Sequence, residues 1–405
     1  MHAREMGELM SDHLATLASA IADHQAGRLA EAEAAYLSVL AQRPDDPDAL
    51  HFFGLLKFHR GEGVEAVRLI MQSLGHAPAN AHAWNNLGNV LLTQDKLVEA
   101  KEAYRRASLL APGLAVVWFN LGICRRDEGA FDEAASHFRT AIKHEPRFLR
   151  AYEMLGRMLF RRGEYAQASE VYSAWLAKDP ENPVARHLAA ALSGTQVPRR
   201  ADDRYVASVF DHYAASFDEH LKHLEYRAPE LVSGNLAPLL EPGGNAVILD
   251  AGCGTGLCGP LLRPLCSRLA GVDLSSRMID QARRRGGYDE LVVAELGAFM
   301  RDRAGAFDAI VSADTLVYFG ALEEVCEAAH LALRPRGLFV FTVEALLTGD
   351  APHQLMVHGR YAHRDTYLRS VLEQHGFAVL ELRREALRME RLQDVIGYLV
   401  IARRG

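Results

Sequence analysis

A strict period of 34 residues runs through the first half of the chain. Its clearest markers are prolines, which recur at Pro44, Pro78, Pro112, Pro146 and Pro180. Large residues keep the same spacing, with glycines four positions later: Leu50, Trp84, Trp118 and Tyr152, then Gly54, Gly88, Gly122 and Gly156. A fixed period of this length is typical of stacked supersecondary units, so it predicts a solenoid for the first half of the chain.

Each unit has the pattern of two amphipathic helices. Alanines recur in one column and mostly aromatic residues four positions later: Ala32, Ala66, Ala100, Ala134 and Ala168, then Tyr36, Ile70, Tyr104, Phe138 and Tyr172. The alanines would let the helices approach, and the proline would end the second helix. Unit one departs with Ala20 in place of glycine, and residues 183–192 suggest a capping helix. We expect about five units over 13–182, within an all-α domain over 1–192.

These columns resemble the tetratricopeptide-repeat family. The resemblance implies a concave groove, lined by the first helix of each unit, in which a protein partner would bind. In the last two units the groove positions are mostly arginines: Arg126, Arg150, Glu153, Arg157 and Arg161. A cationic end of the groove is one interpretation, and ordinary solvated charges on a helix face are the other.

The second half of the chain has a different pattern. Residues 193–204 contain Gly, Pro, Arg and Asp with few apolar residues, which predicts a linker. Beyond it, 205–405 alternates short apolar runs with helical stretches. The expected strands are 246–249, 269–273, 291–295, 307–312, 338–343, 378–382 and 397–402, and the expected helices include 275–285, 322–333 and 364–375. This alternation is typical of a parallel sheet covered by helices on both faces.

A glycine-rich turn follows the first expected strand, with Gly252, Gly254 and Gly256. Glycine lets backbone pass close to a ligand, and the following helix offers free N–H groups. The glycines alone do not identify that ligand. Together with Gly259 they also satisfy G-x-G-x-x-G, the pattern of dinucleotide-binding proteins, so a nicotinamide reductase is an alternative at this point.

Acidic residues discriminate between these ligands, because they end three adjacent expected strands: Asp250, Asp273 and Glu295. Three acids suit a ligand with several hydroxyl and amino donors. With residues 250–256 matching D-x-G-x-G-x-G, the segment 205–405 resembles the class I S-adenosylmethionine-dependent methyltransferases. The resemblance implies a Rossmann-like α/β fold with a seven-stranded, mostly parallel sheet whose last strand is antiparallel.

The same resemblance implies how each matching residue would bind S-adenosylmethionine. The glycines would bring backbone against the methionine part, whose amino group Asp250 would orient directly or through water. Asp273 would accept hydrogen bonds from the two ribose hydroxyls. Glu295 stands where the family has an aspartate near the adenine amino group, with helix capping as the alternative role. Leu274 and Leu296 would flank the adenine ring.

Three further segments are similar to bacterial methyltransferases that carry tetratricopeptide repeats. They are the stretch 210–226, which begins Phe-Asp-His-Tyr-Ala-Ala-Ser-Phe-Asp, and the later Leu-Val-Tyr-Phe-Gly and Gly-Arg-Tyr-Ala-His. The similarity joins both halves of the chain. It implies that a helix around Tyr213 and Phe217 lies over the cofactor as a lid, whereas simple packing of these aromatic residues onto the sheet is the alternative.

The chemistry of the acceptor side is less defined. Methyl transfer from a sulfonium needs chiefly positioning, and a general base helps only if the nucleophile keeps its proton. The candidate bases are Tyr213, Asp314, Tyr318, Glu344 and His363. Between the fifth strand and the late helix, Arg360, Tyr361 and His363 cluster in a segment that would suit an anionic substrate, with surface or capping roles as the alternative.

Composition bounds the remaining possibilities. A net charge of −7 gives no electrostatic footprint for nucleic acid, and the absence of long apolar runs and of a leader predicts a cytoplasmic protein without membrane spans. The five cysteines lack metal-ligand spacing, so no metal is expected. We expect a methyltransferase that acts on a protein or small-molecule O or N nucleophile. A repeat scaffold with a regulatory S-adenosylmethionine-binding domain is the alternative.

Overall fold

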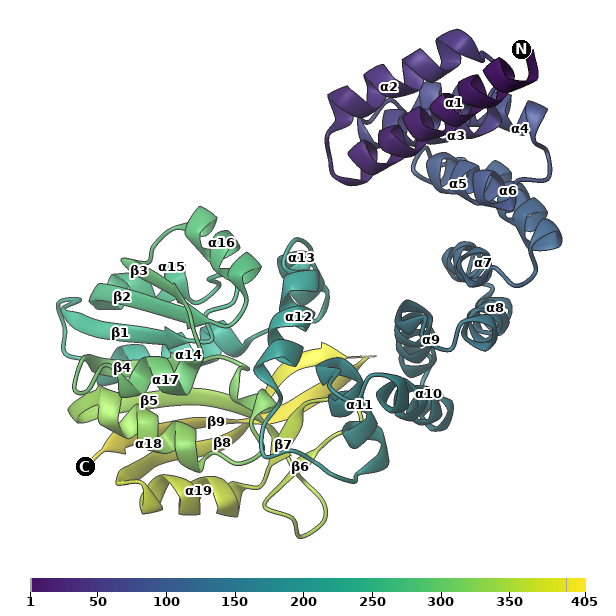
Figure 1. The fold of residues 1–405 in the computed structure, drawn as a ribbon. Coiled ribbons are helices and arrows are strands. Elements are labelled where there is room, and N and C mark those ends of the chain that lie inside the picture. Colours follow the sequence, from purple (N-terminus) through teal and green to yellow (C-terminus); the bar gives the residue numbers. More distant parts are fainter. Residues whose placement is uncertain (1, 391) are drawn as a thin grey trace. The chain divides into compact units, whose positions relative to one another are not determined.

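The computed structural model describes residues 2–390 and 392–405. The chain forms two compact units, Met1–Glu164 and Tyr165–Gly405 (Figure 1). Each unit has its own hydrophobic clusters, and the boundary between the units lies before the predicted linker 193–204. No helix in the described part of the chain is long and apolar enough to cross a membrane.

The first unit consists of helices that follow each other in antiparallel pairs. They are α1 (His2–Gln25), α2 (Leu29–Gln42), α3 (Pro47–His59), α4 (Gly63–His76), α5 (Ala81–Leu92), α6 (Leu97–Leu110), α7 (Ala115–Asp127), α8 (Phe131–His144) and α9 (Leu149–Arg161). A Cβ on Gly88 would lie 2.5 Å from the ring of Tyr104, and one on Gly122 would lie 2.6 Å from that of Phe138. The glycine column therefore exists because the aromatic column fills the space above it.

Two members of the column of large residues, Trp84 and Trp118, form hydrogen bonds at the starts of their helices. The indole N–H of Trp84 donates to the carbonyl of Pro78 at 2.9 Å, and Trp118 repeats this contact with Pro112 at 2.7 Å. Each bond satisfies a carbonyl in the turn that precedes the helix, where intrahelical partners are lacking. The prolines and the large residues thus keep the same period because they contact each other.

The second unit begins with helices and continues as an α/β sheet. Its helices are α10 (Tyr165–Lys178), α11 (Pro183–Ser193), α12 (Asp203–Tyr213), α13 (Phe217–His223), α14 (Ala228–Leu236), α15 (Gly259–Leu262), α16 (Ser276–Arg285), α17 (Leu296–Arg301), α18 (Glu323–Ala332) and α19 (Asp365–Gln374), with short 3₁₀ turns η1 (Ala237–Leu239), η2 (Arg263–Leu265) and η3 (Leu316–Tyr318). The strands are β1 (Ala246–Ala251), β2 (Cys266–Asp273), β3 (Glu290–Val293), β4 (Phe307–Ser312), β5 (Leu333–Ala345), β6 (His353–Leu355), β7 (Tyr361–His363), β8 (Phe377–Glu390) and β9 (Gln393–Arg404). The expected capping helix over 183–192 is α11.

The sheet confirms the predicted fold class. Strands β3, β2, β1, β4 and β5 are parallel neighbours in that order, and β9 pairs antiparallel with β5 and with β8. These seven strands correspond to the predicted sheet with its antiparallel last strand. Two short strands were not predicted: β7 pairs with the end of β5 at Glu344 and Ala345, and β6 pairs with β7.

Both faces of the sheet are covered, so each strand alternates between two cores. On β1, Leu249 packs in the cluster that includes Phe299 of α17 and Leu368 of α19. Its neighbour Ile248 points to the opposite cluster, which includes Leu231 of α14. Burial on both faces explains the continuous apolar runs of the sequence. It also leaves the carboxyl ends of the strands as the edge where polar side chains collect.

Candidate active site

The glycine-rich turn lies at the carboxyl end of β1 and has a left-handed backbone. Gly252 has φ +82°, and a Cβ there would lie 2.2 Å from the hydroxyl oxygen of Thr315. A side chain at this position would therefore be both strained and blocked. The N–H groups of Gly252 and Cys253 donate to the carbonyl of Val272 at 2.8 and 3.0 Å, which fixes the turn against β2. Gly254 has φ +54° with open space where a Cβ would be, so backbone is exposed to a ligand here.

Asp250 is fully buried beneath this turn. Its Oδ2 accepts a hydrogen bond of 2.6 Å from the hydroxyl of Tyr288, while its Oδ1 has no partner among the described residues. Burial raises the pKa of Asp250 to about 7. The sequence did not point to Tyr288, because this residue lies in the short connection between α16 and β3, outside any motif. Its contact with Asp250 makes it part of the site.

Asp273 ends β2 with both carboxylate oxygens turned to backbone. Its Oδ1 accepts from the N–H of Ser275 at 2.9 Å, and its Oδ2 accepts from that of Gly254 at 3.0 Å. Burial raises its pKa. Each oxygen keeps a further lone pair, so two more donors can be accepted. Of the two leucines expected around the adenine ring, Leu274 is half-buried, and Leu296 is the buried first residue of α17.

The sequence suggested that Glu295 ends the third strand, but the strand ends before it. Strand β3 stops at Val293, and Glu295 is the N-cap of α17, where it accepts from the N–H groups of Gly297 at 2.9 Å and Ala298 at 2.7 Å. Capping satisfies helix N–H groups that have no intrahelical partner. Arg200 also donates to Glu295 at 3.1 Å. The carboxylate thus lies at the expected edge but already has several donors.

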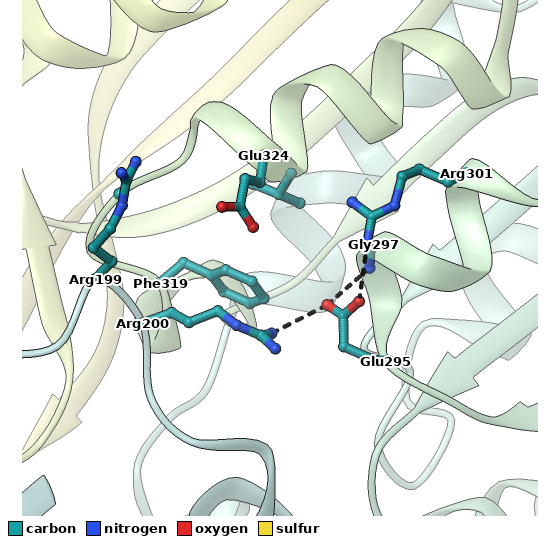
Figure 2. Close-up of a pocket in the computed structure, with 9 residues that line it drawn as sticks. Arg199, Arg200, Glu295, Gly297, Arg301, Phe319 and Glu324 are labelled. Carbon is teal, nitrogen blue, oxygen red and sulfur yellow. Dashed lines mark hydrogen bonds and ion pairs between the residues drawn. The ribbon is translucent and has the colours of Figure 1, made fainter.

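A polar cavity of about 320 Å³ lies beside Glu295 (Figure 2). It is lined by Arg199, Arg200, Glu295, Gly297, Arg301, Phe319, Ala321, Glu324 and Val325. One side comes from α17 and α18, and the other from the segment that precedes α12. The candidate site therefore includes residues from outside the α/β sheet.

The segment expected to form a lid helix consists of α12 and α13. Side chains of these helices contact the glycine-rich turn and α16. Asp211 of α12 accepts from the Ser275 hydroxyl at 2.6 Å. Asp218 of α13 accepts from the Thr255 hydroxyl at 2.6 Å and from Arg285. Both contacts involve polar side chains that the sequence analysis did not single out. They place α12 and α13 at the ligand edge of the sheet.

Of the two aromatic residues expected in the lid, Phe217 packs edge-on against Phe210 with 5.8 Å between ring centroids. Tyr213 stacks on His220 at 6.5 Å. Phe210 in turn packs edge-on against Tyr318 at 5.5 Å, which connects α12 to the loop after β4. These rings pack among α12, α13 and η3, and their roles in a lid and against substrate stay predictions.

Charged side chains meet at the carboxyl ends of β4 and β5. The hub is Arg388 of β8, only 4% exposed, which donates to Asp314 at 2.6 Å, to Glu390 at 2.7 Å and to Glu344. Arg360 donates to Glu344 and Glu390, both at 2.6 Å. We call Asp314, Glu344, Arg360, Arg388 and Glu390 the ion cluster. Arg388 was missed because a lone arginine late in a strand gives no sequence signal.

The acids of the ion cluster differ in their remaining capacity to bind. Burial raises the pKa of Asp314, although the Arg388 charge opposes that effect. For Glu344 burial acts upward, but the His358 hydrogen bond and the charges of Arg360 and Arg388 hold its pKa well below the usual range. Glu344 is therefore ionised and engaged. Asp314 keeps its Oδ1 without a partner in the described chain.

The other acceptor-side candidates are buried in ways that decide their state. His363 is 0% exposed on β7, where its Nε2 contacts the carbonyl of Gly320 at 3.1 Å and burial lowers its pKa to about 4. Burial raises the pKa of Tyr318 to about 12. Tyr361 donates its hydroxyl to the carbonyl of Pro198 at 2.6 Å. The segment with Arg360, Tyr361 and His363 is thus internal structure.

Comparison with known families agrees with this geometry. Residues 249–341 match the family described as methyltransferase domain, and residues 54–114 and 119–183 match the tetratricopeptide repeat. The chain thus combines tetratricopeptide repeats with a methyltransferase domain. The first match begins in β1 and ends in β5, so it includes Asp250, Asp273 and Asp314.

Individual relatives of the methyltransferase domain cover smaller parts of the chain. Human methyltransferase-like protein 27 is 39% identical over 105 residues, which are 25% of this chain and 43% of that protein. Malonyl-[acyl-carrier protein] O-methyltransferase of Salmonella typhimurium is 29% identical over 147 residues, 36% of this chain and 55% of the relative. The chain thus spans about half the length of these curated relatives. A crystal structure of an S-adenosylmethionine-dependent methyltransferase from Mesorhizobium loti is 24% identical with a TM-score of 0.35, covering 42% of this chain and 96% of that one.

Proposed function

We propose that this protein transfers a methyl group from S-adenosylmethionine to an O or N nucleophile. The observation that carries the proposal is the pair of acids around the glycine-rich turn. Asp250 offers a buried oxygen without a partner, and Asp273 offers two oxygens that each retain a lone pair. Unpartnered buried oxygens are rare unless a ligand or water satisfies them.

These residues fit the cofactor group by group. The ammonium of the methionine part would complete the hydrogen bonding of Asp250, which Tyr288 holds in place through its other oxygen. The ribose hydroxyls would donate to Asp273, while the left-handed backbone at Gly252 and Gly254 keeps space free of side chains. When bound, S-adenosylmethionine supplies a methyl group on an activated sulfonium. The protein then needs mainly to position the nucleophile and to exclude water.

Among the candidate bases, Asp314 has the best support for taking the acceptor's proton. It follows β4, and its neighbour Thr315 donates its hydroxyl to the carbonyl of Gly252 at 3.2 Å, so Asp314 lies next to the cofactor turn. Its raised pKa suits proton transfer near neutral pH better than the ionised Glu344 or the buried His363. The names of the O-methyltransferase relatives favour an oxygen acceptor.

Calorimetry with S-adenosylmethionine, S-adenosylhomocysteine and NADH tests the cofactor assignment. We expect binding of the first two and none of NADH. Transfer of a radiolabelled methyl group to hydroxyl, carboxylate and amine acceptors then tests the activity. Cofactor binding without transfer to any acceptor, including proteins, would instead favour a regulatory S-adenosylmethionine-binding domain on a repeat scaffold.

The repeats are proposed to recruit a protein partner through their groove. The groove end predicted to be cationic is partly neutralised, because Arg126 pairs with Asp127 at 2.7 Å and Arg157 with Glu153 at 3.4 Å. Arg150 lies over the ring of Phe119 at 5.0 Å. Reversing Arg126 and Arg150 to glutamate should weaken partner methylation through KM, and more at low salt, while small acceptors are unaffected. Equal KM values for the partner would remove these arginines from recognition.

A further inference from the structure

The segment 198–203, which we call the strap, joins α11 to the lid helix α12. Its composition predicts a free linker, but its backbone is hydrogen-bonded along its length. Arg199 accepts at its carbonyl from the N–H groups of Gly320 at 2.9 Å and Ala321 at 2.8 Å. The N–H of Ala201 donates to the carbonyl of Tyr318 at 2.8 Å, and a β-bridge joins Arg200 to Phe319.

The strap is also held at its start, by the α/β domain. The hydroxyl of Tyr361 donates to the carbonyl of Pro198 at 2.6 Å. Upstream, the buried His187 of α11 contacts the carbonyl of Gly359 at 2.8 Å and stacks on Tyr205 of α12 at 4.1 Å between ring centroids. These contacts place the strap in one conformation on the loop that follows β4.

Two consecutive arginines of the strap take different partners. Arg199 pairs with Glu323 at the start of α18 at 3.2 Å. Arg200 pairs with Glu295 at 3.1 Å and with Asp203 at 3.0 Å, and its guanidinium lies over the ring of Phe319 at 5.6 Å. Figure 2 shows the Arg200 guanidinium directed at Glu295, and both residues line the polar cavity. The strap therefore supplies a wall of that cavity.

The consequence concerns the carboxylate of Glu295. Two helix N–H groups fix the carboxylate at the start of α17, one on each oxygen. Arg200 donates a further hydrogen bond to Oε1, so it favours one orientation of the group. A carboxylate held in this way can accept a further donor at little additional cost in conformational entropy.

We infer that Arg200 is a positioning residue that presents Glu295 to the 6-amino group of the cofactor's adenine, which makes the strap part of the cofactor site. This inference rests on the proposed use of S-adenosylmethionine. The strap connects the last repeat-like helices to the lid, so the site is completed by residues that precede the methyltransferase domain. Arg204 follows the strap, is largely exposed, pairs with Asp202 at 3.3 Å and lies outside the lining of the polar cavity, so it provides a matched control.

Calorimetry on the full chain tests the inference with two probes. One is S-adenosylhomocysteine, and the other is S-inosylhomocysteine, in which a carbonyl oxygen replaces the 6-amino group. The wild-type protein should prefer the adenosyl compound, because a carbonyl oxygen cannot donate to a carboxylate. Glu295→Gln should remove most of this preference.

Arg200→Ala should raise the Kd for S-adenosylhomocysteine about fivefold and reduce the preference for it over the inosyl probe, since a partly exposed ion pair orients the carboxylate. Arg200→Lys should restore part of the preference. Arg204→Ala should change either Kd by less than about twofold. A merely structural role of Arg200 would weaken both probes alike and leave their ratio unchanged.

The inference is wrong if Arg200→Ala keeps the wild-type ratio of the two Kd values, if it has no more effect than Arg204→Ala, or if the wild-type protein does not discriminate between the probes. Failure of the proposed function has a different signature, because the wild-type protein would then bind neither probe. Thermal denaturation of each variant shows whether it is folded, and the ratio of Kd values is insensitive to a partly inactive sample.

Discussion

The two halves of the ligand edge of the sheet solve the problem of buried charge in opposite ways. At the ends of β1 and β2, Asp250 and Asp273 contact neutral donors and retain capacity to accept more. At the ends of β4 and β5, acids and arginines neutralise each other in the ion cluster. An isolated buried acid can take up a proton, whereas several adjacent charges must pair. The first arrangement leaves room for a ligand, and the second builds a rigid wall.

The largest expected effect is on the ion cluster. Arg388→Met would leave Asp314 buried without its charged partner and would remove one of the donors to Glu344, so the free energy of unfolding should fall by about 3–5 kcal/mol. Urea denaturation measures it. The control is Arg383→Ala on the same strand, where a largely solvent-screened pair with Glu381 and Glu385 should contribute less than about 1 kcal/mol. Equal losses in the two variants would mean that the ion cluster is not a rigid wall.

The next effect is on cofactor affinity. Asp273→Ala should weaken binding of S-adenosylmethionine by about 1.5–3 kcal/mol, the range for hydrogen bonds to a charged group. Asp280→Ala, on the exposed face of α16, should leave the affinity unchanged. An unaltered Kd in a folded Asp273→Ala variant would exclude Asp273 from ribose binding.

A pH dependence distinguishes Asp250 from the ion cluster. Because burial raises its pKa to about 7, the folded protein keeps this proton above about pH 4, where the unfolded chain has lost it. Folding then binds more protons, so stability should fall as pH rises from about 4 to about 7 and change no further above that. Asp250→Asn cannot titrate, and it should gain stability relative to the wild type over this window.

Unfolding free energies of both proteins at several pH values check this expectation. Cofactor binding adds a second readout, because an ammonium beside Asp250 favours the ionised carboxylate. Below about pH 7, binding should release a proton from the wild type but not from Asp250→Asn, as measured by calorimetry in buffers of different ionisation enthalpy. Parallel pH curves for the two proteins would show that Asp250 is ionised throughout.

The smallest effect separates the two halves of the edge. Arg360→Lys should lower the free energy of unfolding by about 1 kcal/mol, because an ammonium cannot bind Glu344 and Glu390 with the same fork. Its Kd for S-adenosylhomocysteine should match the wild type. A large increase in acceptor KM with unchanged stability would support the prediction that Arg360 binds an anionic substrate.

Much of the fold follows from local patterns in the sequence. The 34-residue period predicts the repeats because each unit buries the same surface against the next. Strand β4 coincides with its predicted range 307–312, since strands buried on both faces give uninterrupted apolar runs. The predicted ranges for β8 and β9 were too short. Their extensions include Arg388 and other charged residues whose partners lie far away in the sequence.

The site was predictable only where a residue's role depends on its immediate neighbours. Asp250 and Asp273 end strands, so their positions at the edge follow from the strand pattern. Glu295 was misplaced because β3 has only four residues and the helix that follows begins three positions after its end. Tyr288 and Arg200 reach the site through contacts between distant segments. No single-sequence pattern encodes such contacts.

That the chain divides at 193–204 into parts that fold independently stays a prediction. The contacts of the strap affect where such a division can be made. To exchange the repeats of this protein for another repeat array, one must choose the position at which the two sequences are joined. A crossover at the strap would replace residues that hydrogen-bond to Tyr318, Gly320 and Tyr361. A crossover between Glu164 and Tyr165 would carry α10, α11 and the strap along with the enzyme half. The segment to be kept together in such an exchange therefore begins before the catalytic fold and includes α10, α11 and the strap.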